Sequence, residues 1–178
     1  MITHDYRLFV PKQAVGANLV YFDIFNASGS GVTLLISSIN PVISGAAAVT
    51  GVLGVDLFLT RTSAVGTGGT AATTDGTDVT AMTFSKMNPK LTALPTLVTA
   101  RLTPTGGATA GAVLSMVSVF TEETAAASYM GQLIDFVDKG ANPEEIVIPE
   151  GFGVRVIQGA VASVGNIGFN IALGIRPS

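Results

Sequence analysis

Short β-prone segments recur along this chain, and each is followed by a cluster of turn-forming residues. Val, Ile, Leu and Thr dominate the segments, while most of the 21 glycines and 8 prolines lie in or next to the clusters between them. β-branched residues favour strands, and glycine and asparagine supply the positive φ angles of tight turns. This pattern predicts an all-β protein built from antiparallel strands.

The clearest strand is the last one. From Ile167 to Ile175 every second residue is apolar, which is the period of a strand with one buried face. Val55, Leu57 and Leu59 share one face of another strand in the same way. Further strands are expected at residues 19–25, 32–39, 49–61, 82–84, 96–102, 113–120, 132–137, 145–148 and 154–158.

The strands predict a single β-sandwich domain over residues 19–178, arranged as a jelly roll, because their number suits two packed sheets. Residues 1–18 contain Pro11 and Gly16 and are predicted to be an extended N-terminal arm that adds a strand to a neighbour's sheet. Residues 62–96 show neither strand nor helix period and are predicted to be a long loop that contacts a partner.

Three local predictions complete the fold. The strands at 19–25 and 32–39 flank the turn formers of residues 26–31 and are expected to pair as a hairpin, with Pro41 ending the second. Thr121, followed by two glutamates, is expected to cap the one short helix of the chain.

Charge is the most unusual part of the composition. Only 12% of the residues are charged and 48% are hydrophobic, whereas a soluble domain carries about 25% charged residues. Much of the exterior is therefore expected to be apolar or hydroxyl-bearing, and such surfaces are commonly buried against partners. This predicts a homo-oligomer, with a trimer favoured and a dimer open. The net charge of −3 and the scattered basic residues disfavour nucleic acid, and no apolar run suits a membrane helix.

No residue is predicted to be catalytic, cofactor-binding or metal-binding. The chain has no cysteine, and His4 is its only histidine, so thiolate metal sites are excluded and a catalytic triad could use only His4. Asp75 and Asp78 could hold a calcium ion, but an ordinary loop is the preferred interpretation. The remaining carboxylates are interpreted as solvated turn or cap residues rather than a glycosidase pair: Glu122, Glu123, Asp135, Asp138, Glu144, Glu145 and Glu150.

Two kinds of glycine-rich segment need an interpretation. Residues 66–69 and 106–107 lack the following helix and lysine of a phosphate-binding loop, so they are predicted to be turns. The Ala- and Gly-rich stretches at 45–48 and 108–112 could allow backbones or subunits to approach closely, but ordinary loop packing is the preferred interpretation.

Five phrases of the sequence are distinctive together: 25–32 (FNASGSGV), 61–70 (RTSAVGTGGT), 100–109 (ARLTPTGGAT), 120–124 (FTEET) and 150–156 (EGFGVRV). They resemble a family of small virion structural proteins from tailed bacteriophages and prophages. Because they are turn and strand-edge sequences without chemistry, the resemblance carries over no functional residues.

The resemblance implies a non-enzymatic capsid decoration (cement) protein, located in the virion after assembly in the host cytoplasm. Its implied partners are the major capsid protein or other virion proteins. The alternative is a carbohydrate-binding or tail-fibre module on a similar sandwich, which needs exposed aromatic side chains. Tyr6, Tyr21 and Tyr129 are the only tyrosines available to it, and the residue inventory disfavours a hydrolase.

Overall fold

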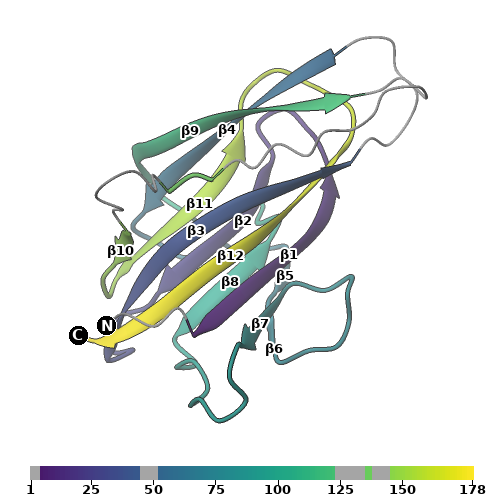
Figure 1. Ribbon diagram of the computed structural model, residues 1–178. Coiled ribbons are helices and arrows are strands. Elements are labelled where there is room, and N and C mark those ends of the chain that lie inside the picture. Colours follow the sequence, from purple (N-terminus) through teal and green to yellow (C-terminus); the bar gives the residue numbers. More distant parts are fainter. Residues whose placement is uncertain (1–4, 45–51, 123–134, 138–144) are drawn as a thin grey trace.

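The structure, a computed structural model, describes residues 5–44, 52–122, 135–137 and 145–178 (Figure 1). These residues form two packed six-stranded sheets and contain no helix, which confirms the predicted all-β sandwich. Sheet A has the order β10 (Ile146–Ile148), β3 (Val32–Ser44), β12 (Asn166–Pro177), β1 (Tyr6–Ala14), β7 (Thr83–Lys86) and β6 (Thr73–Thr74). Sheet B has the order β5 (Thr70–Ala71), β8 (Val98–Leu102), β2 (Val20–Asn26), β11 (Phe152–Gln158), β4 (Val52–Thr62) and β9 (Ala110–Glu122).

Eight of the strands form four nested antiparallel pairs. The outermost pair in the sequence is β1 with β12, followed inward by β2 with β11, β3 with β10 and β4 with β9. The pairs fall alternately in sheet A and sheet B. This nesting is the strand arrangement of a jelly roll, in which two Greek keys share one core.

The core lies between the sheets and is centred on β12. Its residues Ile167, Phe169, Ile171 and Leu173 are fully or almost fully buried, as their alternation predicted. The Phe169 ring packs edge-on against the Phe22 ring at 5.1 Å and against Tyr21 at 5.5 Å between centroids. These contacts join the middle of sheet A to the middle of sheet B.

The N-terminal segment differs from its prediction. Residues 6–14 are extended, but they form β1, an internal strand of sheet A between β12 and β7, rather than an arm outside the domain. Tyr6, Leu8 and Val10 are buried in the core. Their spacing of two already carried this signal, and the proline and glycine nearby outweighed it in the prediction.

The predicted loop at 62–96 contains three short strands. β7 and β6 extend sheet A beyond β1, while β5, together with β8, extends sheet B beyond β2. The short strand expected at 82–84 is confirmed as β7. The insertion between β4 and β9 therefore widens both sheets.

The predicted hairpin and its end at Pro41 are both wrong. The turn at 26–31 crosses from β2 in sheet B to β3 in sheet A, so these strands do not pair. β3 continues through Pro41 to Ser44. Ile39 bonds outward through its N–H to Asp135 and through its carbonyl to Phe136, so the nitrogen of Pro41, two residues on, also faces away from β12.

The helix expected from Thr121 is also corrected where it can be seen. Thr121 lies in β9 and pairs with Leu53 of β4, and the pairing of these two strands continues to Glu122. The rest of that helix, from residue 123, lies outside the described residues, as does the Ala-rich stretch at 45–48. Of the strand expected at 132–137, residues 135–137 are described and are not a strand, although Phe136 and Val137 are buried.

Replacing Phe169 with alanine is expected to lower the free energy of unfolding by about 3–5 kcal/mol, because the ring is 1% exposed and fills the space between the sheets. Urea titration monitored by circular dichroism measures the loss. Phe9→Ala is the matched control, since that ring is 36% exposed on the outer face of the neighbouring β1. Equal losses in the two variants would contradict a core centred on Phe169.

Candidate interaction surfaces

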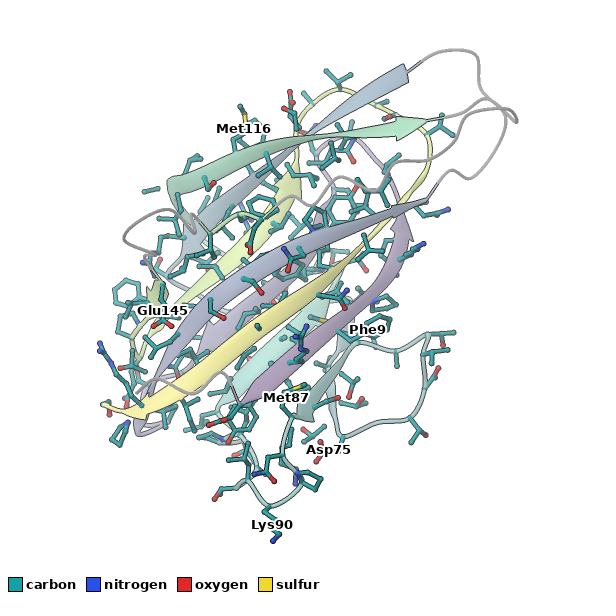
Figure 2. All side chains as sticks on the ribbon, viewed as in Figure 1. Phe9, Asp75, Met87, Lys90, Met116 and Glu145 are labelled. Atoms are coloured by element: carbon teal, nitrogen blue, oxygen red, sulfur yellow. The ribbon has the colours of Figure 1, made fainter. Side chains whose placement is uncertain are left out.

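β9 forms the edge of sheet B and is largely exposed. Its only neighbour in the described sheet is β4, so its other side carries no strand. The Val113 side chain is 61% exposed and that of Met116 is 55% exposed, and Met116 projects outward from the strand (Figure 2). An apolar edge strand of this kind is an attachment site for another chain. We refer to this side of Ala110–Glu122 as the β9 edge.

A hollow of about 540 Å³ lies beside the beginning of the β9 edge. Its walls are mostly apolar, and the exposed Phe152 ring forms one of them. Arg61 lies in the wall, donates a hydrogen bond to the Val147 carbonyl, and has its pKa lowered by burial. The lining residues are Arg61, Thr62, Ser63, Gly111, Ala112, Val147, Pro149 and Phe152.

Close approach explains the small residues at this end of β9. A Cβ at Gly111 would lie 3.0 Å from the Cβ and 3.2 Å from the carbonyl oxygen of Arg61, so a larger residue here would require Arg61 to shift. The close approach that was the second interpretation of the stretch 108–112 is thus seen at Gly111, within the chain.

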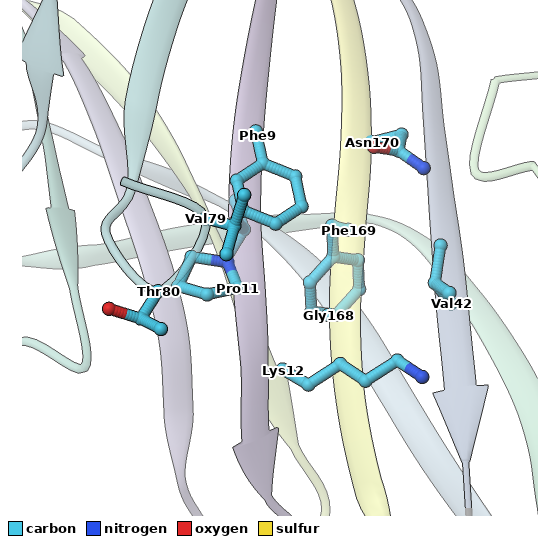
Figure 3. A pocket seen from close by; sticks show the side chains of 10 residues that line it. Phe9, Pro11, Lys12, Val42, Val79, Thr80, Gly168, Phe169 and Asn170 are labelled. Carbon is cyan, nitrogen blue, oxygen red and sulfur yellow. The ribbon is translucent and has the colours of Figure 1, made fainter. Parts of the chain in front are cut away.

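A second hollow, of about 400 Å³, lies on the outer face of sheet A (Figure 3). Phe9, Pro11 and Val79 stand on one side of it, and Lys12 extends across β12 toward Val42 on β3. The lining is apolar apart from Lys12, Thr80 and Asn170. This sheet A hollow and the β9 edge belong to different sheets, so the molecule carries two separate apolar surfaces.

A buried carboxylate, Asp23, holds a loop over the outer face of sheet B. It lies in β2 between the core residues Phe22 and Ile24, and its Oδ2 accepts a hydrogen bond of 2.7 Å from the Gly66 N–H. Burial raises the pKa of Asp23, while the Gly66 N–H and the charges of Arg101 and Arg155 oppose that rise. The hydrogen bond to the Gly66 N–H thus fastens the loop to β2.

The two glycine-rich segments are turns, as predicted, and they pack against each other. The Thr67 N–H donates to the Gly106 carbonyl at 2.6 Å, and the Thr105 N–H donates to the Thr67 carbonyl at 3.0 Å. Gly68, Gly69 and Gly107 have positive φ angles, so glycine is required by the backbone rather than by a phosphate.

A second carboxylate site joins two turns to the C-terminus. Glu150, between β10 and β11, accepts hydrogen bonds from the N–H groups of Gly29 at 2.7 Å and Gly31 at 2.9 Å. It also accepts one from the Ser178 hydroxyl at 3.0 Å. The Gly29 N–H, and then the Ser178 hydroxyl, lower the pKa of Glu150.

The possible calcium ligands have partners within the chain. Asp75 forms an ion pair with Lys86 at 3.2 Å and accepts its N–H, and these contacts lower the Asp75 pKa. Asp78 accepts bonds from the N–H and hydroxyl of Thr80 at 2.8 and 2.7 Å. Within the described ranges no three His, Cys, Asp or Glu side chains form a group that could hold a metal ion.

The other candidate residues of the sequence analysis do not form a common site among the described residues. Tyr6 and Tyr21 are buried, and their hydroxyls donate to the Thr92 carbonyl and to Gln158 Oε1, both at 2.7 Å. Neither offers a sugar-stacking surface. Asp135 accepts N–H groups of Ile39 and Val137. The candidates outside the described residues are His4, Glu123, Tyr129, Asp138 and Glu144.

Comparisons with known proteins add no relative. No family model, no curated protein and no solved structure matches this chain. In the part of the chain that is described, no helix is long and apolar enough to cross a membrane.

Gly66→Ala is expected to lower the free energy of unfolding by about 1–3 kcal/mol, because the added Cβ would overlap Asp23 Oδ2 and lie 2.9 Å from the Pro104 Cβ. Thermal unfolding measures the change. The control is Gly16→Ala, whose Cβ would meet nothing closer than the Leu19 Cβ at 3.7 Å. A destabilisation no larger than that of the control would show that Asp23 does not hold this loop in place.

Glu150→Gln is expected to lower the melting temperature at pH 7, by an amount that becomes smaller as the pH falls below 4.5. The folded-state pKa of Glu150 lies below its ordinary value of 4.5, so the carboxylate stabilises the fold above pH 4.5. That stabilisation is lost as the pH falls through the lower folded-state pKa. Melting curves of both proteins across this range provide the test, and a pH-independent difference would contradict it.

Proposed function

We propose that this chain is a non-enzymatic structural subunit of a bacteriophage virion, a decoration protein that binds over the capsid and stabilises neighbouring capsomers. The β9 edge, a long apolar edge strand beside an apolar hollow, is the observation that carries the proposal, because such a surface suits attachment to another protein. The resemblance of five sequence phrases to phage virion proteins is the reason for placing this chain in a virion.

A cementing protein needs at least two contact surfaces, since it joins two neighbours. The β9 edge with Phe152 offers one, and the sheet A hollow with Phe9 and Val79 offers the other. A specific interface buries about 800 Å² on each partner. At about 25 cal/mol per Å² of apolar area, burial of that size gives a useful affinity even after the cost of association.

The polar groups of the described residues support a structural role. Several carboxylates, among them Asp23 and Glu150, accept hydrogen bonds from N–H groups of their own chain. The described exposed aromatics, Phe9 and Phe152, line different hollows. A carbohydrate-binding module would bring such rings together on one surface, so this alternative gains no support.

The experiment is to delete the coding sequence from the phage or prophage that carries it and to purify the particles. We expect the chain to be found in wild-type particles by mass spectrometry. Particles lacking it are expected to release their DNA at a lower temperature or after weaker osmotic shock, and added purified protein is expected to restore resistance. Wild-type resistance without the protein, or its absence from particles, would overturn the proposal.

A further inference from the structure

The four sheet edges of the described fold are unequal. β5 and β6 have two residues each and β10 has three, whereas β9 has thirteen. Proteins usually protect long edges with charged residues or proline, or cover them. From Ala110 to Thr121 the β9 edge has neither charge nor proline.

The direction of the unused backbone groups follows from the neighbouring strand. The Gly159 N–H donates to the Asp56 carbonyl, so the backbone groups of Asp56 face β11 and those of Leu57 face β9. Leu57 lies opposite Val117, whose groups therefore face β4. By alternation, the N–H and carbonyl groups of Met116, Ser118 and Phe120 face away from β4.

This part of the edge is also regular. The pairing of β9 with β4 runs without a bulge from Val52 opposite Glu122 to Leu59 opposite Ser115, and irregularities occur only beyond Leu59. An unbulged strand with its groups aligned can accept another strand along its whole length.

We propose that the β9 edge pairs with the β9 edge of a second copy of this chain, antiparallel and across a twofold axis at Ser118. Ser118 then lies opposite Ser118 of the second copy, and Met116 lies opposite Phe120. All three outward-facing residues take part, which gives about six backbone hydrogen bonds. The interface is isologous, the commonest kind in soluble homo-oligomers.

Charge favours a second copy as the occupant. The only charged residue of β9, Glu122, falls opposite Leu114 in this register, so no like charges face each other. Asp56, on β4, accepts a hydrogen bond from the hydroxyl of Ser118 on β9. The two Asp56 residues of the dimer would be three strand spacings apart, about 14 Å. That distance exceeds the Debye length of about 8 Å at physiological salt, so their repulsion is weak.

The expected strength follows from the area. Seven paired residues extend over about 24 Å, and a strip of that length across both faces buries roughly 400 Å² per copy. This is half of a standard interface, to which the exposed Val113 and Met116 add apolar area. Reversible dimers with a micromolar dissociation constant are therefore expected, in place of the trimer favoured by composition.

A single introduced cysteine gives a direct test, since the chain has none. In the proposed pairing the Cα atoms of Ser118 and its counterpart lie about 5.5 Å apart, within the range of a disulfide. Mild oxidation of folded Ser118→Cys is expected to give a covalent dimer. Thr74→Cys, on the exposed short edge strand β6 of the other sheet, is the matched control and is expected to give no covalent dimer.

A second pair of variants separates the edge hydrogen bonds from the side chain. Ser118→Pro removes an outward N–H without removing a bond to β4, and it is expected to weaken the dimer about tenfold or more in sedimentation. Ser118→Ala loses the same hydroxyl bond to Asp56 but keeps the N–H, so it is expected to dimerise like the wild type.

Three results would overturn the pairing: a wild-type chain that is monomeric at about 100 μM, a folded Ser118→Pro variant that dimerises normally, or equal cross-linking of both cysteine variants. A wild-type monomer without Ser118→Cys cross-linking would mean that the edge is covered by the chain itself or kept for another protein. The pairing occupies the β9 edge with a second copy, and the dimer still presents two contact surfaces, one sheet A hollow from each copy. A dimer that fails to bind phage heads would therefore defeat only the proposed function.

Discussion

The register of β12 is the constraint on which the rest of the structure depends. It lies between β3 and β1, and Ile167, Phe169, Ile171 and Leu173 all point into the core. A slip by one residue would turn these side chains to the outside and place Gly168 and its alternate neighbours inside. The contact of Phe169 with Tyr21 and Phe22 then fixes sheet B over sheet A.

Strands were predictable where one face is buried, and their partners were not. The alternation at Val55, Leu57 and Leu59 identified the inner face of β4 because burial imposes a period of two. The turn at 26–31 gave no means of telling a hairpin from a crossing between sheets, since both need the same turn residues. Pro41 was misread because its effect depends on which side of the strand is bonded, and only the pairing of β3 decides that.

The candidate surfaces were predictable in kind but not in place. The low charge of the chain indicated an apolar exterior, and the strand at 113–120 was expected. That this strand is the edge of sheet B follows from the nested pairing, in which β4 and β9 are the innermost pair in sequence and β9 has no further partner among the described strands. Edge position is a property of the topology, so the composition of the strand could not reveal it.

The few charged residues have a further consequence for the exterior. Of the twelve acidic residues, at least five bind backbone N–H groups of their own chain: Asp23, Asp75, Asp78, Asp135 and Glu150. Charge-assisted bonds of this kind are stronger than neutral ones and hold loops that lack a core of their own. Four of the five, Asp75, Asp78, Asp135 and Glu150, lie outside the strands, so their charge does little to polarise the outer faces of the strands. The same residues that order the loops thus leave β9 and the outer face of sheet A apolar, which is the condition under which such surfaces associate.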